Sequence, residues 1–265
     1  MNNINKKKLY ILTFLAVLLF IFTTQLISNI AKIRQDSENI KAEKIMDECI
    51  SASIWRSHRD IRECWITIER KDSYNNELQY YSRDNVYIDG DIIEIISKKE
   101  SKEDKEYTSG LVESSCAYKY GYFEFTIQTS QGKGLFPAIW LLPEEDKGLP
   151  EIDIFEMIGS EPYVFYGVIH YEQDGAKLSD YFAHAVPVKD KYVIALEWKK
   201  DRLIWYIDGS KVYETESGVP QEYMYLIINQ AVGGDWPGNP DDKVFPCRFK
   251  ILSMSIESMF MKGRD

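Results

Sequence analysis

The chain has 265 residues, of which 45% are apolar and 14% aromatic, which is enough apolar material for one large core. Its formal net charge is −10, although the first 31 residues contain three lysines and no acidic residue. An acidic surface repels phosphate backbones, which argues against a nucleic-acid partner. Three histidines and four scattered cysteines, with no CxxC pair, offer little material for a zinc site.

The N-terminus carries a predicted membrane segment. A lysine triplet precedes an uncharged stretch over 9–31 that contains LYILTFLAVLLFIF. At about 1.5 Å per residue, this stretch is long enough to span a bilayer. A cleaved signal peptide is the alternative, but the stretch ends without small residues at A-x-A spacing. We therefore expect a cytoplasmic tail over 1–8 and an uncleaved signal-anchor over 9–31.

Residues 32–57 read as a short helical stalk. Ile40, Ile45, Cys49 and other apolar residues recur at helical spacing, with charged residues between them. Such a face would pack on the body of the protein or on a second copy of the chain. No chemistry is indicated here.

The body is predicted to be all-β. From about Trp65 onward, short runs rich in Ile, Val, Tyr and Phe alternate with turn signals, and Asp-Gly pairs at 89–90 and 208–209 indicate tight hairpins. The pattern has no strand–helix–strand alternation and no internal repeat. Ten or more short strands in about 200 residues indicate one domain, built as a two-sheet sandwich or a barrel.

The segment EIDIFE at 151–156 carries the candidate chemistry. It places Glu151, Asp153 and Glu156 in a short apolar strand. In a regular strand Glu156 would point away from the other two acids and into the core, where an ionisable group is costly. A β-bulge near 154–155 adds one residue and turns all three acids to one face. We therefore predict a bulged strand whose acids line a cleft.

The spacing of these acids indicates a reaction class. With the bulge, the two glutamates lie roughly 13 Å apart at Cα, at ~3.3 Å per ladder step. Side chains that lean together bring the carboxyls to ~5 Å, the separation of a retaining glycosidase. Asp153 between them would hydrogen-bond the nucleophile, but the residues alone do not say which glutamate attacks. Two plainer interpretations stay open: the acids line a solvated strand face, or they bind calcium.

Motifs along the body reinforce the glycosidase interpretation. In chain order they are NNELQYY at 75–81, NVYIDGDIIEI at 85–95, YTSGLVES at 107–114, YGYFEF at 120–125, GLFPAIWLLP at 134–143, EIDIFEMIG at 151–159, GVIHY at 167–171, LEWKKDRLIWYIDG at 196–209 and AVGGDWPGNP at 231–240. Together they resemble glycoside hydrolase family 16, in the bulge-containing branch that includes the laminarinases (endo-β-1,3-glucanases). The resemblance covers about residues 54–257.

The resemblance implies a fold and a set of roles. It implies a catalytic domain over 58–260, built as a two-sheet antiparallel jelly-roll sandwich whose concave sheet forms the sugar cleft. It implies Glu151 as nucleophile, Asp153 as its assistant and Glu156 as general acid/base. The family's substrate-binding positions fall on Trp140, His170, Trp236, Asn239 and Asn75.

The chain also departs from the family pattern. Phe136 precedes Pro137 where relatives commonly have Trp-Pro, and Ser73-Tyr74 stands in place of Trp-Gly. Many relatives bind a structural calcium through an aspartate in the last strand, where this chain has Leu252. We therefore expect no metal site, and the resemblance implies no cofactor.

Three functions compete. The first is a retaining endo-acting β-glycanase, most simply on β-1,3-glucan. The second is a transglycosylase or hydrolase that remodels a self-made envelope or exported polysaccharide, and the third is a non-catalytic carbohydrate-binding relative. Because polysaccharides lie outside the membrane, we expect a single-pass cell-membrane protein with an extracytoplasmic body, or a secreted one if the N-terminus is cleaved. The partners expected are the polysaccharide and the membrane, without an obligate protein partner.

Overall fold

The computed structural model describes residues 64–90, 92–145 and 147–264. The predicted tail, signal-anchor and stalk, over 1–8, 9–31 and 32–57, lie outside the described residues, and the boundaries of the catalytic domain stay a prediction. Within the described ranges, no helix is long and apolar enough to cross a membrane.

The described part of the chain is built almost entirely from strands, with two short 3₁₀ turns at Arg83–Asn85 and Asp242–Val244. The strands are β1 (Trp65–Thr67), β2 (Gln79–Tyr81), β3 (Val86–Asp89), β4 (Ile92–Ser97), β5 (Tyr107–Ser109), β6 (Leu111–Gln128), β7 (Leu135–Pro143), β8 (Glu151–Glu156), β9 (Val164–Gln173), β10 (Ala176–Ala185), β11 (Tyr192–Trp198), β12 (Leu203–Ile207), β13 (Ser210–Thr215), β14 (Met224–Val232) and β15 (Cys247–Gly263). The all-β prediction is confirmed.

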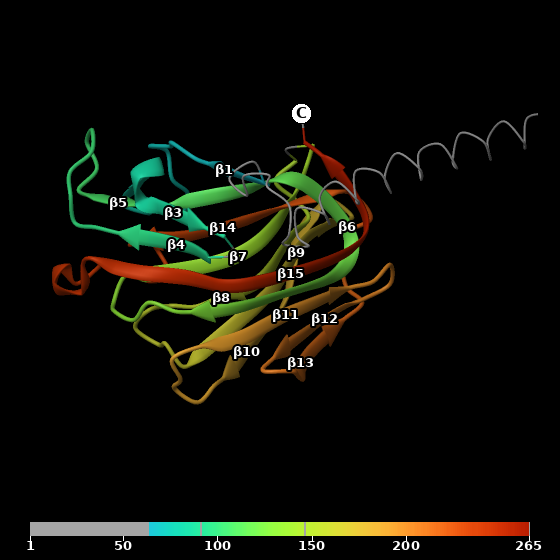
Figure 1. The fold of residues 1–265 in the computed structure, drawn as a ribbon. Coiled ribbons are helices and arrows are strands. Elements are labelled where there is room, and N and C mark those ends of the chain that lie inside the picture. The colour runs from blue at the N-terminus through green and yellow to red at the C-terminus, as the bar shows by residue number, and fades with distance from the viewer. Residues whose placement is uncertain (1–63, 91, 146, 265) are drawn as a thin grey trace, which may run out of the picture. The chain divides into compact units, whose positions relative to one another are not determined.

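The strands form two layers that share one long strand. The inner layer runs β10-β9-β8-β7-β14 and ends on the first half of β6, while the second half of β6 continues into β11-β12-β13 of the outer layer. On its other edge β6 pairs with β15, which in turn pairs with β4. β6 bends where Tyr120 and Gly121 have φ values of 56° and 141° (Figure 1). The predicted jelly-roll-like sandwich is thus present, with both layers linked into one hydrogen-bonded sheet.

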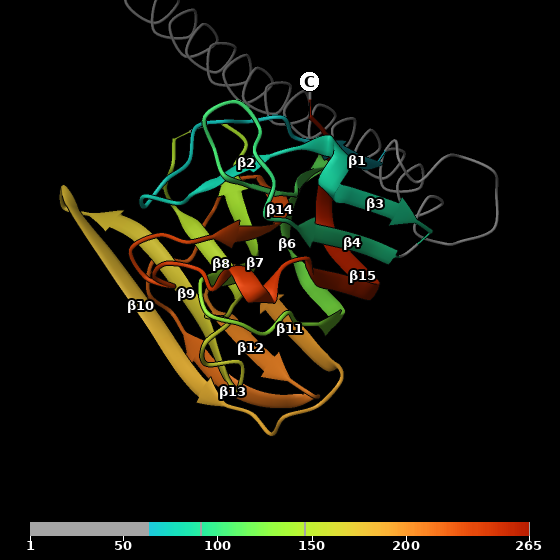
Figure 2. The same ribbon diagram turned by 90° about the vertical axis from the view of Figure 1, so that its left-hand side faces the viewer.

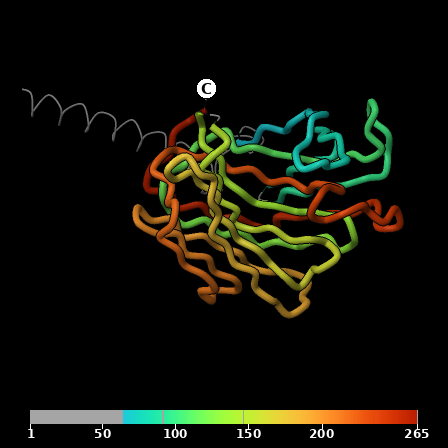
Figure 3. Tube along the Cα trace, turned by 180° about the vertical axis from the view of Figure 1, so that it is seen from behind, coloured from blue at the N-terminus to red at the C-terminus, as the bar shows by residue number. Residues whose placement is uncertain are grey.

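Figures 2 and 3 show how the strands of the two layers are arranged. Figure 2 shows β10, β9, β8 and β7 side by side in the inner layer, as their pairing requires. In Figure 3 the cyan to green segment before β6 lies along one side of the molecule, and the yellow to orange strands β9–β13 lie along the opposite side. One pair departs from the antiparallel prediction, because β2 and β5 run parallel.

The core lies between the layers and anchors the strand that carries the candidate acids. Phe155 of β8 packs edge-on against Phe165 of β9, with ring centroids 4.9 Å apart. It also stacks on Phe249 of β15, in the outer layer, at 6.0 Å. All three rings are buried, and aromatic pairs of this kind stabilise beyond the area they bury. Strand β8 is therefore held in position by aromatic contacts with its neighbour β9 and with the outer layer.

The two predicted hairpins form, one of them shifted. Asp208 and Gly209 both have positive φ and connect β12 to β13, because Ile207 pairs with Ser210. In the other hairpin, Asp89 pairs with Ile92, so the aspartate belongs to β3 and Gly90 begins the turn. The turn is thus displaced by one residue from the predicted Asp-Gly pair.

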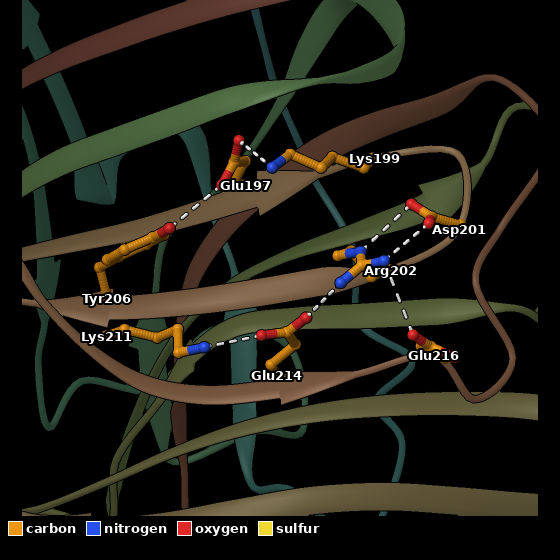
Figure 4. A network of polar contacts seen from close by, with 8 residues as sticks. All are labelled: Glu197, Lys199, Asp201, Arg202, Tyr206, Lys211, Glu214 and Glu216. Atoms are coloured by element: carbon orange, nitrogen blue, oxygen red, sulfur yellow. Dashed lines mark hydrogen bonds and ion pairs between the residues drawn. The ribbon is translucent and has the colours of Figure 1, made fainter.

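An ion-pair network covers part of the solvent side of β11–β13 (Figure 4). Arg202 lies 2.9 Å from Asp201, 2.8 Å from Glu214 and 3.7 Å from Glu216. The neighbouring carboxylates raise the pKa of the Arg202 guanidinium. Because these groups are solvated, each pair contributes little to stability, and the network mainly keeps this face charged and soluble.

We expect Gly121→Ala to lower the free energy of unfolding by about 3 kcal/mol or more. A Cβ atom there would lie 2.3 Å from the Glu257 carbonyl oxygen of β15, at a φ of +141°. Gly175→Ala is the matched control, since its φ of +76° is also positive but nothing lies within 4 Å of the added atom. Urea unfolding of the full chain measures the free energy of unfolding of both variants. Equal losses would show that the close approach of β15 does not require glycine at position 121.

Candidate active site

Strand β8 contains the predicted bulge. Its neighbour β7 pairs Ile139 with Phe155 and Trp140 with Asp153, so that Ile154 is the extra residue. The pairing with β9 is interrupted over the same stretch. The bulge predicted near 154–155 is therefore confirmed.

The bulge places the three acids on one face of the inner layer. Asp153 and Glu156 lie opposite Trp140 and Ala138, and two residues separated by one position on β7 share a face. Glu151 lies on the same face, two positions before Asp153. Along β7 the paired register runs from Ala138, opposite Glu156, to Leu141, opposite Ile152, which is the residue next to Glu151.

His170 lies beside the acids, directly opposite Glu151 on β9. Its Nε2 is 3.4 Å from Oδ2 of Asp153, and its Nδ1 is 2.6 Å from the Ser179 hydroxyl of β10. Asp153 is only 3% exposed, and its Oδ2 has no hydrogen-bond partner among the described residues. Glu151, Asp153 and His170 each offer one potential metal ligand, and these atoms lie within 4.8 Å of one another. The sequence predicted no metal here, and that stays a prediction.

Burial raises the pKa of every acid in the group. Burial is the larger cause for Asp153 and Glu156, whose pKa values rise well above the ordinary range, and repulsion from Glu151 adds to both. Burial also raises the pKa of Glu151, while His170 opposes the rise. The raised pKa values favour the protonated form of these carboxyls, as a proton donor requires, while His170 favours the ionised form of Glu151.

Trp140 is held in place beside the acids by a chain of hydrogen bonds. Its indole Nε1 donates to Oδ1 of Asn229 on β14 at 2.8 Å, and Nδ2 of Asn229 donates to the Tyr81 hydroxyl at 2.9 Å. Tyr81 is fully buried. Neither Asn229 nor Tyr81 was predicted as a site residue, although a polar residue within the apolar run LIINQAV indicates a buried hydrogen-bond partner.

An aromatic group lies at the Glu156 end of the same face. Trp236 is 44% exposed and contacts Phe136 and Tyr166 edge-on, with ring centroids 5.2 and 4.9 Å away. Tyr166 lies opposite Glu156 on β9, so the group adjoins the acids. Trp236 was predicted from the sequence but Tyr166 was not, because it lies on β9 one position before the GVIHY motif.

A cavity of about 1020 Å³ opens at the Glu151 end. Asn75 lines it together with Glu151, His170, the loop at 147–150 and the loop at 218–222. This volume is at the upper end of small-molecule sites, so it accommodates more than one sugar-sized group.

Of the two asparagines predicted for substrate binding, Asn75 lines the cavity and Asn239 does not. The backbone carbonyl of Asn75 accepts from the Asp235 amide at 2.9 Å, which joins its loop to the Trp236 loop. Asn239 is exposed further along that second loop and does not line the cavity. Of the eight predicted site residues, seven are thus tied by register or contact to one face and its cavity, namely Glu151, Asp153, Glu156, Trp140, His170, Trp236 and Asn75.

Comparisons with known proteins agree on one family. The model of glycosyl hydrolases family 16 matches residues 73–246. A beta-glucanase of Rhodothermus marinus is 30% identical over 213 residues, which are 67% of this chain and 72% of the relative. The endo-1,3-1,4-beta-glycanase EglC of Rhizobium meliloti is 33% identical, over 52% of this chain but only 30% of that protein. The laminarinase catalytic domain of Thermotoga maritima superposes with a TM-score of 0.67 at 28% identity, covering 77% of this chain and 94% of that one.

We expect Glu156→Gln to raise the melting temperature at neutral pH. Because the folded state raises the pKa of Glu156 above its ordinary value of 4.5, the folded state binds the proton more tightly than the unfolded chain does. The wild type therefore loses stability as pH rises above about 4.5, whereas the glutamine variant lacks this loss. The gain in melting temperature should vanish below pH 4.

Thermal unfolding from pH 4 to pH 8 measures this difference. Glu172→Gln is the control, because Glu172 is a glutamate of β9 that is exposed to solvent. A Glu156→Gln curve parallel to the wild-type curve over the whole range would contradict the expectation.

Proposed function

Because the chain belongs to glycosyl hydrolases family 16, in the laminarinase-like branch, we propose that this glycosidase is a retaining, endo-acting β-glycanase. The proposed substrate is a polysaccharide of the β-1,3-glucan type. The observation that carries the proposal is the bulge at Ile154, which brings Glu151, Asp153 and Glu156 to one face beside Trp140. Double displacement requires two carboxyls on one face, one to attack the sugar and one to protonate the leaving oxygen.

In the proposed first step, Glu151 attacks the anomeric carbon while Glu156 protonates the leaving oxygen, giving a glycosyl-enzyme and a shortened chain. The electrostatics support this assignment. The pKa of Glu156 rises well above its ordinary value, as a proton donor requires, whereas His170 offsets the rise at Glu151 and favours its ionised form. Asp153, between them and buried, shares a proton with the nucleophile.

In the proposed second step, Glu156 is the base. Having given up its proton, it takes one from a water molecule, whose oxygen attacks the anomeric carbon and releases Glu151. Two displacements at the same carbon retain its configuration. A sugar hydroxyl that replaces this water would make the same residues a transglycosylase, with products longer than the substrate.

Substrate binding is proposed to follow the inner face across the strands. Pyranose C–H groups would pack on the ring of Trp140, opposite Asp153, and on the ring of Trp236, at the Glu156 end. His170 and Asn75 line the cavity at the Glu151 end, and Asn239 lies on the Trp236 loop. A chain that passes through an open face instead of ending in a closed pocket is cut internally, which supports endo action.

We expect Glu151→Gln and Glu156→Gln to lower the rate of polysaccharide hydrolysis by at least about 100-fold each, because each removes a group that moves charge in the transition state. The measurement is the release of reducing ends from β-1,3-glucan, mixed-linkage β-1,3/1,4-glucan, agarose and carrageenan by the full chain. Glu216→Gln, on the outer ion-pair network, is the control with unchanged activity.

Product analysis decides between the alternatives. Early NMR spectra should show the β-anomer, and oligomers longer than the substrate would establish transfer in place of hydrolysis. Early appearance of the α-anomer would contradict retention. A wild type that binds one polymer without cutting any would favour a carbohydrate-binding protein.

The proposed location is the outer face of the cell membrane, with residues 9–31 as a single-pass anchor. This rests on the uncharged N-terminal stretch and on where polysaccharides are found. Protease added to intact cells should degrade the body, and carbonate washing should leave the full-length chain in the membrane. A chain released by carbonate would contradict the anchor, and a shortened chain in the medium would indicate cleavage.

A further inference from the structure

Three side chains of the candidate active site are arranged as metal ligands. Nε2 of His170 and Oδ2 of Asp153 are 3.4 Å apart. Two ligands bound to one tetrahedral zinc ion at ~2.0–2.1 Å are separated by roughly 3.3–3.4 Å, the edge of that tetrahedron. This pair thus has the required separation without rearrangement. Glu151 offers a third ligand atom within 4.8 Å of both, at the end of a side chain with rotatable bonds.

The imidazole of His170 is oriented by a second contact. Its Nδ1 lies 2.6 Å from the Ser179 hydroxyl. With the proton on Nδ1 donated to that oxygen, the lone pair of Nε2 points toward the carboxylates. A histidine whose second nitrogen is hydrogen-bonded in this way is the usual form of a metal-binding histidine in proteins.

Asp153 provides an independent reason for a cation. It is 3% exposed, and its Oδ2 makes no hydrogen bond to any described residue. A buried carboxylate oxygen that makes no hydrogen bond is costly, and a cation bound between it and Nε2 of His170, 3.4 Å away, would satisfy it. Access is available, because Glu151 and His170 both line the cavity of about 1020 Å³.

We propose that Glu151, Asp153 and His170 bind a divalent transition metal, with zinc as the best match. Mixed nitrogen and carboxylate ligands suit zinc, whereas calcium and magnesium require more oxygen ligands and seldom accept imidazole. Resting on the proposed function, we further infer that the bound metal inhibits hydrolysis, because it occupies the carboxylate that would attack the sugar. The site is thus an inhibitory metal site that competes with the substrate.

Binding is tested without reference to activity, by isothermal titration of the full chain with zinc chloride. The wild type should show one site that His170→Gln weakens at least about 100-fold, since loss of a ligand should cost more than loss of a second-sphere partner. Ser179→Ala, an exposed position, should weaken the same site about 10-fold while leaving all three ligands present. His184→Gln is the matched control, an exposed histidine of β10 that lies away from the acids.

The two parts of the proposal fail separately. If His170→Gln and Ser179→Ala both bind zinc within about threefold of the wild type, or if no one-to-one site is found, the metal site is overturned. If zinc binds as expected but the wild type cuts no polysaccharide, the proposed function fails and the site stands. If zinc binds and hydrolysis proceeds unchanged at saturating zinc, the inhibitory role is overturned. Inhibition that added polysaccharide relieves would support it.

Discussion

The single extra residue in β8 is the constraint on which the site depends. Without it, Glu156 would point between the layers, where Ile152 and Phe155 lie buried. A bulge leaves part of the ladder unpaired, and here the structure compensates from the opposite layer. Trp205 of β12 donates its indole N–H to the Asp153 carbonyl at 3.1 Å. The outer layer thus contributes directly to the geometry of the inner face.

Placing three carboxyls close together in a buried site costs free energy, which the rest of the fold must offset. Three carboxyls share one short strand. Burial raises the pKa of each, and repulsion adds to the rise at Asp153 and Glu156. Such a group persists only on a rigid frame, and the stacked rings of Phe155 and Phe249 supply that frame across the two layers. The crowding of three buried carboxyls suits the group to proton transfer and also makes it a candidate metal site. The proposed catalysis and the proposed inhibition therefore depend on the same side chains.

Residues far apart in sequence meet around the acids because the shared strand β6 brings both layers together. Tyr81, from the segment before β6, contacts Asn229 of β14, which holds Trp140 of β7. Trp236, from the loop after β14, contacts Phe136 and Tyr166 on two different strands. These contacts fix Trp140 and Trp236 against β7 and β9, the two strands that flank the one carrying the acids.

Much of this was determined by the sequence alone. The alternation of apolar residues predicted the strands, and the cost of burying Glu156 predicted the bulge, because both follow from local geometry and solvation. The supporting contacts were decided only by the tertiary structure. Nothing local indicates that Asn229 receives the indole N–H, that Ser179 orients His170, or that Trp205 reaches the bulge from the other layer. His170 and Ser179 are separated by 9 positions, and the other two pairs by 89 and 52. Such partners depend on strand register, strand order and layer packing, and they leave no periodic signal in the chain.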